Sequence, residues 1–260
     1  MNEKKKQWIQ NLIAAGFIAV TAGVILIGNT SFKTRMEAAT KNEVQENTAA
    51  SAAPSAYQNY MRNLPGAIQE KIKTAVETKK PLQLIIAGDE ATGGWPEILE
   101  KQLNKAYGKD VFKVMVKSYP QKTTEQWVKE HIHAEIAALH PDILLFEPAL
   151  LLDGGVVEKA ASVTNTQLIL EEIQKRNPEA VLLVQPPNPL YGAKHYPETV
   201  QMVKQGIEEK GYTYVDHWTA WPQDETLQQY LESPDGFAND KGRQLWAQYM
   251  VNYFTAKSAE

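Results

Sequence analysis

The 260-residue chain contains no cysteine. Its absence excludes disulfide bridges, thiol catalysis, cysteine-ligated metal and a lipid-modified N-terminal cysteine. A cysteine-free chain is compatible with a place outside a Gram-positive membrane, where oxidative folding is not needed. The chain also lacks strong charge of one sign: its formal net charge is -4 and its basic clusters are short. Nothing therefore indicates a nucleic-acid-binding protein.

Several catalytic signatures are missing as well. There is no GxSxG nucleophile elbow, no P-loop and no GxGxxG, and the pair Gly93-Gly94 alone is no fingerprint. His131-Ile132-His133 is predicted in the middle of a helix, where the two rings would point to different faces and would not share a metal ion. We therefore expect neither a metal nor a cofactor.

Hydropathy divides the chain into an N-terminal segment and a folded domain. Residues 1–7 are basic and polar, and residues 8–28 carry no charge, which matches the roughly 20 residues of a membrane-spanning helix. Lys4, Lys5 and Lys6 predict a cytoplasmic tail, so we expect a single-pass plasma-membrane protein with its C-terminal domain outside. The alternative is a cleaved signal peptide, although the segment is long for one and GNTSFK is a poor cleavage site.

The segment after the predicted anchor has a different composition. Residues 29–55 are rich in alanine, threonine, serine, asparagine and glutamate and have few large apolar side chains. Such a segment cannot bury much surface, so we interpret it as a stalk or linker. The folded domain is then expected at residues 56–260, where the overall hydrophobic content of 43% allows a sizeable core.

Strands and helices are predicted to alternate along this domain. A helical pattern from residue 56 to 80 is interrupted at Pro65. Five short apolar runs predict strands at residues 82–87, 111–116, 143–146, 180–184 and 212–215. Helices are expected at residues 96–107, 124–139, 167–176, 198–210, 225–232 and 240–256. The helix starts have capping signals: Thr123 with Gln126, Thr164 with Gln167, and Asn239. The expected fold is a flavodoxin-like, three-layer α/β/α sandwich with a five-stranded parallel sheet.

Chemistry in such a fold gathers where the parallel strands end. The loops there are rich in carboxylates, histidines and aromatic residues, namely Asp89, Glu90, Asp153, His195, Asp216, His217, Asp235, Trp95, Tyr191, Trp218, Trp221 and Phe237. A rim of this composition suits a polar ligand such as a sugar. The alternative is that these are the ordinary polar residues of loops.

Four blocks in these loops resemble one known family. The chain reads Gly88-Asp89-Glu90-Ala91-Thr92 after the first strand, with Gly, Trp and Pro following. It then reads Pro120-Gln121 with Trp127, Glu147-Pro148 with Leu152-Asp153, and Pro234-Asp235-Gly236-Phe237 before the last helix. In order and content these blocks resemble the SGNH (GDSL-type) hydrolases, especially membrane-anchored versions from Gram-positive bacteria. The resemblance covers the whole predicted domain.

The residues that give this family its name are all replaced. By the resemblance, Glu90 stands at the serine nucleophile, Gln121 at the oxyanion-hole glycine, Leu152 at the oxyanion-hole asparagine and Phe237 at the histidine base. Ester hydrolysis by this route needs a nucleophile activated by an imidazole and donors aimed at the oxyanion. We therefore expect a catalytically degenerate protein that binds a cell-envelope polysaccharide or envelope protein.

Other interpretations remain open. A ligand pocket could involve Asp89, Glu90, Thr92, Gln121, Asp153, His217 and Asp235. An active esterase or deacetylase on acylated envelope glycans could use Thr92 as nucleophile with His217 as base, although the favoured interpretation of Thr92 is a turn or helix-capping residue. A hydrolase could also pair Glu90 with Asp153 or Asp235, as glycosidases pair two carboxylates, although Glu90 could simply favour the helix dipole.

Overall fold

The structure is a computed structural model that describes residues 57–89, 94–234 and 236–256. The predicted cytoplasmic tail, membrane anchor and linker lie outside these residues, as do Glu90, Thr92 and Asp235. Within the described part, no helix is both long enough and apolar enough to cross a membrane.

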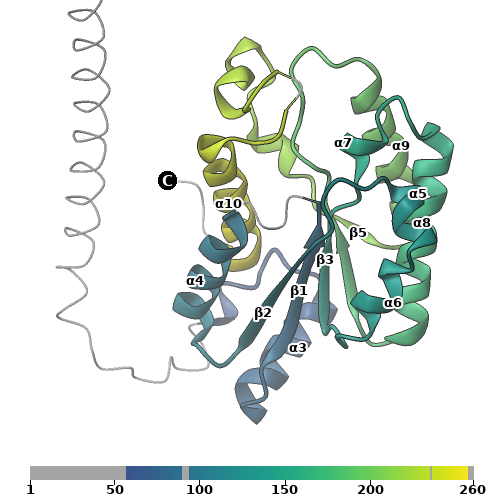
Figure 1. Cartoon of the computed structure of the whole chain (residues 1–260). Helices are drawn as coiled ribbons and strands as arrows, with labels where there is room; N and C mark the ends of the chain where they lie inside the picture. Colours follow the sequence, from purple (N-terminus) through teal and green to yellow (C-terminus); the bar gives the residue numbers. More distant parts are fainter. Residues whose placement is uncertain (1–56, 90–93, 235, 257–260) are drawn as a thin grey trace, which may run out of the picture. The chain divides into compact units, whose positions relative to one another are not determined.

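The centre of the domain is a five-stranded parallel sheet with the order β2-β1-β3-β4-β5 (Figure 1). The strands are β1 (Leu82–Gly88), β2 (Phe112–Ser118), β3 (Ile143–Phe146), β4 (Val181–Val184) and β5 (Thr213–Tyr214). All neighbouring strands run parallel. This is the flavodoxin-like order, in which the strand order reverses between β1 and β3 and ligands bind outside the carboxyl ends at that point. The predicted parallel sheet is confirmed.

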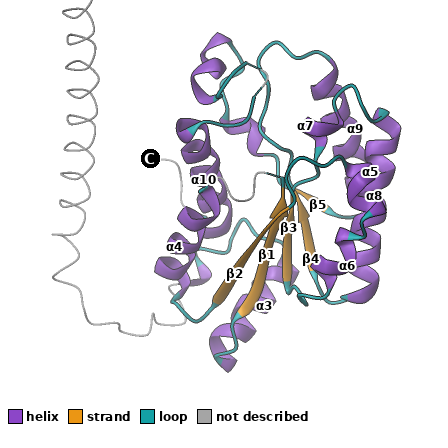
Figure 2. Cartoon of the chain, in the orientation of Figure 1, coloured by secondary structure: helices purple, strands orange, loops and turns teal. Residues whose placement is uncertain are grey.

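Helices cover both faces of the sheet and make three layers (Figure 2). One face carries α3 (Gly66–Thr78), α4 (Trp95–Tyr107) and α10 (Asp240–Thr255). The other carries α5 (Thr124–Lys129), α6 (Ile132–Ala137), α8 (Lys159–Arg176) and α9 (His195–Glu209). Each face has its own apolar core because successive side chains of a strand point to opposite faces. Leu84 and Ile86 of β1 pack in the first core, whereas Ile85 and Ala87 pack in the second.

Short elements at the carboxyl ends of the strands complete the domain. They are α7 (Leu150–Asp153), η1 (His217–Ala220) and η2 (Glu225–Tyr230). The predicted helix at residues 225–232 is thus a shorter 3-10 helix. Neither α7 nor η1 was expected, because each is a single turn and leaves no periodic pattern.

The predicted helix at residues 124–139 needs correction. The segment 124–139 is not one helix but α5 and α6, since His131 between them is left-handed with φ 58°. The rings of His131 and His133 therefore meet edge to face, with centroids 5.5 Å apart, instead of pointing to separate faces. The prediction that the two rings point to different faces was wrong because the helix is interrupted at His131. The sequence gives no clear signal for a left-handed residue there.

The capping predictions have mixed outcomes. Thr123 and Gln126 form the predicted capping box at α5, and the Asn239 side chain caps α10. The box at Thr164 was wrong: α8 begins five residues earlier, and the Thr164 hydroxyl donates to the carbonyl of Ala160 inside the helix. The segment Ser-Val-Thr-Asn-Thr lies inside α8. Its polar residues usually favour helix ends, so the sequence predicted the start of the helix too late.

The described chain begins near the amino ends of the strands, opposite the rim formed by the loops at their carboxyl ends. Tyr57, Met61 and Leu64 are buried in the α10 core, and the Asn63 side chain donates to the carbonyl of Asn252 near the end of α10. α4 starts at the rim after β1, and its last residue, Tyr107, donates its hydroxyl proton to the carbonyl of Phe254. Residue 57, the first described residue, and the candidate site thus lie at opposite ends of the parallel strands.

Candidate functional site

Three adjacent strands end in buried polar residues. The ladder continues past the strand ends, because the Glu147 amide donates to Ala87 and the Gln185 amide to Phe146. This places Gly88, Glu147 and Gln185 in neighbouring positions on the α4 and α10 face. Glu147 is 1% exposed and Gln185 0%. Glu147 is thus a buried carboxylate at the point where the strand order reverses. The sequence analysis did not single it out as a site residue.

Gly88 makes room for Glu147. A Cβ atom at Gly88 would lie 2.7 Å from the Cβ of Glu147 and 3.1 Å from its Oε2. Such distances are far shorter than van der Waals contact. The glycine of the first block is therefore required by packing against the third block, independently of any nucleophile at position 90.

Asp89 joins the turn after β1 to the loop after β2. Its Oδ1 accepts a hydrogen bond of 3.2 Å from the Gln121 amide, and its carbonyl accepts one of 2.9 Å from the Ser118 hydroxyl. Its Oδ2 accepts no hydrogen bond from the part of the chain that the structure describes. Burial raises the pKa of the Asp89 carboxyl from 3.8 to about 6, while the Gln121 amide acts in the opposite direction.

Gln121 has the backbone conformation of a glycine. Its φ is 61°, in the left-handed region that non-glycine residues rarely adopt. The resemblance places a glycine here, with a backbone N–H that donates to the oxyanion. Gln121 thus has the backbone conformation that the resemblance leads us to expect of a glycine, and its N–H donates to Asp89.

Replacing Gln121 with glycine should stabilise the domain by up to about 1 kcal/mol, because it removes the left-handed strain of a residue with a Cβ. The Gln121 side chain is exposed, so little packing is lost. Urea unfolding of the two proteins measures the difference, with Lys113→Gly as a control at an exposed residue in the extended backbone of β2. Equal destabilisation of both variants would contradict the strain at Gln121.

Asp153 serves the scaffold. Its carboxylate is 1% exposed and accepts three hydrogen bonds, from the Thr124 amide at 2.8 Å, the Thr124 hydroxyl at 2.7 Å and the Ser162 hydroxyl at 2.6 Å. These bonds tie α7 to the first residue of α5 and to α8. A carboxylate bonded in this way has little capacity left for acid–base work.

His217 is also part of the scaffold. It is 0% exposed, and its ring stacks on Trp246 with centroids 4.3 Å apart. Nδ1 accepts a hydrogen bond of 2.9 Å from the Trp221 indole, so Nε2 must carry the proton and donate it to the Pro186 carbonyl at 2.8 Å. Burial lowers the pKa of the His217 imidazole from 6.5 to about 4. Both nitrogens are committed, and the ring is neutral near pH 7.

The other histidines lie elsewhere. His131 and His133 flank the start of α6, and His140 precedes β3 at the opposite edge of the sheet. His195, expected in a loop, is instead the first residue of α9; its side chain is 86% exposed and lies 3.6 Å from Glu198. All five histidines are described, and none presents a free ring nitrogen beside Asp89 and Gln121.

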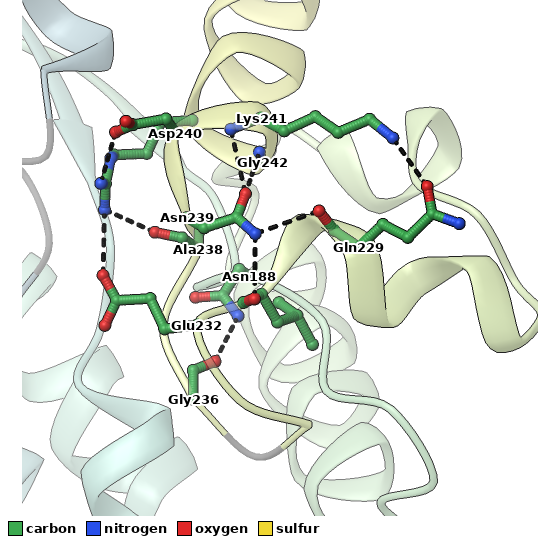
Figure 3. Close-up of polar contacts among 11 residues, drawn as sticks. Asn188, Gln229, Glu232, Gly236, Ala238, Asn239, Asp240, Lys241 and Gly242 are labelled. Atoms are coloured by element: carbon green, nitrogen blue, oxygen red, sulfur yellow. Dashed lines mark hydrogen bonds and ion pairs between the residues drawn. The ribbon is translucent and has the colours of Figure 1, made fainter. Parts of the chain in front are cut away.

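The last block is held by the loop after β4 (Figure 3). The Asn188 side chain donates to the Gly236 carbonyl at 3.1 Å, and the Tyr191 amide donates to the Pro234 carbonyl at 2.9 Å. Phe237, at the position of the family's histidine, is half-buried, and its carbonyl accepts from the Glu232 amide. The Asn239 side chain then caps α10 and donates to the carbonyls of η2 and the residue after it.

The loop after β4 was expected at the rim, with Tyr191 and His195, but the role of its backbone carbonyls was not predicted. Its successive carbonyls at Pro186, Pro187 and Asn188 accept hydrogen bonds from His217, Trp218 and Tyr196. The run Gln185-Pro-Pro-Asn-Pro is the signal that could have identified it, because prolines expose carbonyls without competing N–H groups.

One pocket lies beside the rim, next to α7 and the start of α9. Its volume is about 290 Å³, and its lining includes Leu150, Asp153, Val156, Lys159, His195 and Tyr196. Lys159 pairs with Glu198 across α8 and α9. Of the predicted pocket residues that the structure describes, only Asp153 lines it; Leu152 is half-buried on α7. Within the described ranges, no three histidine or carboxylate side chains are grouped as a metal ion would require.

Comparisons with known proteins agree with this architecture. No protein-family model and no curated sequence matches the chain. Solved structures do match, among them a lipase/acylhydrolase from Enterococcus faecalis (TM-score 0.55, 16% identity, 68% of this chain and 100% of that one). A family 3 carbohydrate esterase from Clostridium thermocellum gives TM-score 0.52 at 14% identity, with 67% and 95% covered.

A peptidoglycan O-acetylesterase gives TM-score 0.58 at 10% identity, covering 78% of this chain and 96% of that one. At such identities a likeness shows the fold alone. It confirms the predicted resemblance at that level: the described domain has the fold of GDSL-type lipases and esterases.

Proposed function

We propose that this chain is a membrane-anchored, catalytically degenerate GDSL-type protein that binds a polysaccharide of the bacterial cell envelope. The observation that carries the degeneracy is the state of the histidines: His217 is fully buried with both ring nitrogens bonded, and the others lie away from Asp89. A serine-type esterase needs a base that can take a proton from its nucleophile. The domain offers no imidazole in that place.

The ligand class is supported by the similar structures. A carbohydrate esterase and a peptidoglycan O-acetylesterase share the fold. Fold alone does not determine function, so this is an argument by analogy. The anchor and the extracellular location of the domain rest on residues 4–28 of the sequence, with their lysines followed by an uncharged run.

An active hydrolase with another constellation is the second candidate, and one observation favours it. Asp89 is a buried carboxyl whose pKa is raised to about 6 and whose Oδ2 accepts no hydrogen bond from the described residues. Carboxyls with raised pKa values are typical of general acids and bases. Activity built on Asp89 would not need His217.

The test offers the purified full-length protein both p-nitrophenyl acetate and O-acetylated peptidoglycan. We expect binding to the insoluble glycan without release of acetate above a buffer control. Asp89→Asn and Glu90→Ala variants accompany the wild type, with Asp110→Asn as an exposed control. Acetate release that Asp89→Asn or Glu90→Ala abolishes would establish the hydrolase instead. Failure to sediment with any envelope glycan would overturn the proposed ligand.

A further inference from the structure

The turn after β1 and the loop after β2 are fastened at three points. The Tyr119 amide donates to the Gly88 carbonyl at 3.0 Å, and the Ser118 hydroxyl donates to the Asp89 carbonyl at 2.9 Å. The third contact is the only one of these to a titratable group: Gln121 N–H to Asp89 Oδ1 at 3.2 Å. Of the three contacts, it involves the loop residue farthest from the end of β2. It therefore holds the exposed Gln121 close to the turn after β1.

The Asp89 carboxyl is poorly compensated in this position. It is 7% exposed, and within the described residues only one of its oxygens accepts a hydrogen bond. A buried carboxylate normally accepts two or more bonds, since an uncompensated buried charge is costly. The neutral acid is therefore accessible in mildly acidic solution, consistent with a pKa of about 6 for this group.

The neighbouring elements contain few groups that could interfere. Among the described residues, the titratable side chains nearby in sequence or packing are Lys117, Tyr119 and Lys122 on β2 and its loop, Glu97 on α4, and Glu147 over Gly88; Glu90, the next residue in the chain, lies outside the described ranges. Burial raises the pKa of Tyr119 to about 12, so this phenol stays neutral in acid. The shift of Asp89 arises from burial and from the Gln121 amide.

We propose that Asp89 is an acid-sensitive clasp between the turn after β1 and the loop after β2, and that its protonation frees the Gln121 N–H at the rim. Hydrogen bonds to a charged acceptor are roughly twice as strong as neutral ones. Protonation thus weakens the bond to Gln121 and leaves the left-handed residue free to relax. The proposal does not depend on whether the rim binds or hydrolyses its ligand.

Hydrogen exchange of the full-length protein tests the clasp between pH 5 and pH 7. After correction for intrinsic rates, amide protection in residues 119–123 should fall about fivefold on acidification, with its midpoint near pH 6. The Asp89→Asn variant should show low protection at every pH. Asp110→Asn, which alters an exposed aspartate after α4, should behave as the wild type does.

Two results would overturn the proposal. One is constant protection of residues 119–123 in the wild type, which needs no variant and holds even if Asp89→Asn fails to fold. The other is a transition that persists unchanged in folded Asp89→Asn, since it would then belong to another group.

Discussion

Replacing His217 with alanine should lower the free energy of unfolding by about 3–5 kcal/mol at pH 7.5, the range seen when large buried side chains are truncated. The imidazole is 0% exposed, stacks on Trp246 and bonds Trp221 and Pro186. Its removal leaves a cavity and strands two buried polar partners, each of which carries a desolvation cost. Chemical denaturation followed by tryptophan fluorescence measures the loss.

The matched control is His195→Ala. His195 is an exposed histidine at the start of α9, so its removal should change stability by less than about 0.5 kcal/mol. If His217→Ala were as stable as His195→Ala, the scaffold role of His217 would be wrong. His217 would then again be a candidate for the catalytic base.

The penalty should also depend on pH. Because the folded pKa of His217, about 4, lies below its ordinary value of 6.5, the unfolded chain binds the proton more readily. The neutral ring therefore contributes fully above pH 6.5, and its contribution falls as the pH drops toward 4, by about 3 kcal/mol in total. The difference between wild type and His217→Ala should shrink over that window.

Asp89 acts in the opposite direction. Its folded pKa of about 6 lies above 3.8, so the folded domain binds this proton more readily than the unfolded chain does. The stabilising contribution is complete below pH 3.8 and is lost as the pH rises through 6. Comparing pH profiles of His217→Ala and Asp89→Asn separates the two effects, since each variant removes one of them.

The sheet could be predicted because its signal is local and redundant. Each strand is a short, mainly apolar run followed by a turn and a helix, so the ends of β1 to β4 could be placed to within two residues. β5 was harder, since Thr213 and Tyr214 form only two ladder positions at the edge. The break at His131 was not predictable, because it depends on one backbone angle.

The candidate site shows the opposite balance. The blocks around Asp89, Gln121 and Phe237 could be found in the sequence, because they carry the spacing of a known family. What each side chain does could not. Whether His217 is a base or a buried spacer depends on Trp221, Trp246 and Pro186, which are brought to it only by folding.

At the described part of the rim, close packing and backbone geometry restrict two positions. Gly88 still leaves space for the third block, and Gln121 still has a glycine's conformation. A Cβ at a tightly packed glycine would collide with a neighbouring element. Such glycines should therefore tolerate substitution poorly.

Gly242→Ala should accordingly destabilise the domain by about 2–3 kcal/mol, the usual cost of overpacking, even though alanine favours helices. A Cβ at Gly242, in the first turn of α10, would lie 2.3 Å from the Tyr230 carbonyl oxygen and 3.0 Å from the Trp221 ring. The Tyr230 carbonyl is held in place because it accepts a hydrogen bond from the Asn239 amide. Thermal unfolding should show a clearly lower midpoint than in the wild type.

Gly66→Ala is the matched control. Gly66 is the first residue of α3, and a Cβ there meets nothing within 4 Å, so the change should stabilise by up to about 1 kcal/mol. Similar effects of the two substitutions would contradict the close approach of α10 to Trp221.

The same contact predicts coupling between Gly242 and His217. A Cβ at Gly242 displaces the Trp221 ring, whose indole N–H holds His217 Nδ1. In the double variant Gly242→Ala/His217→Ala, the displaced indole has no imidazole left to lose. The combined loss of stability should therefore be smaller than the sum of the single losses by at least about 0.5 kcal/mol. Strict additivity would show that Trp221 does not transmit strain from α10 to His217.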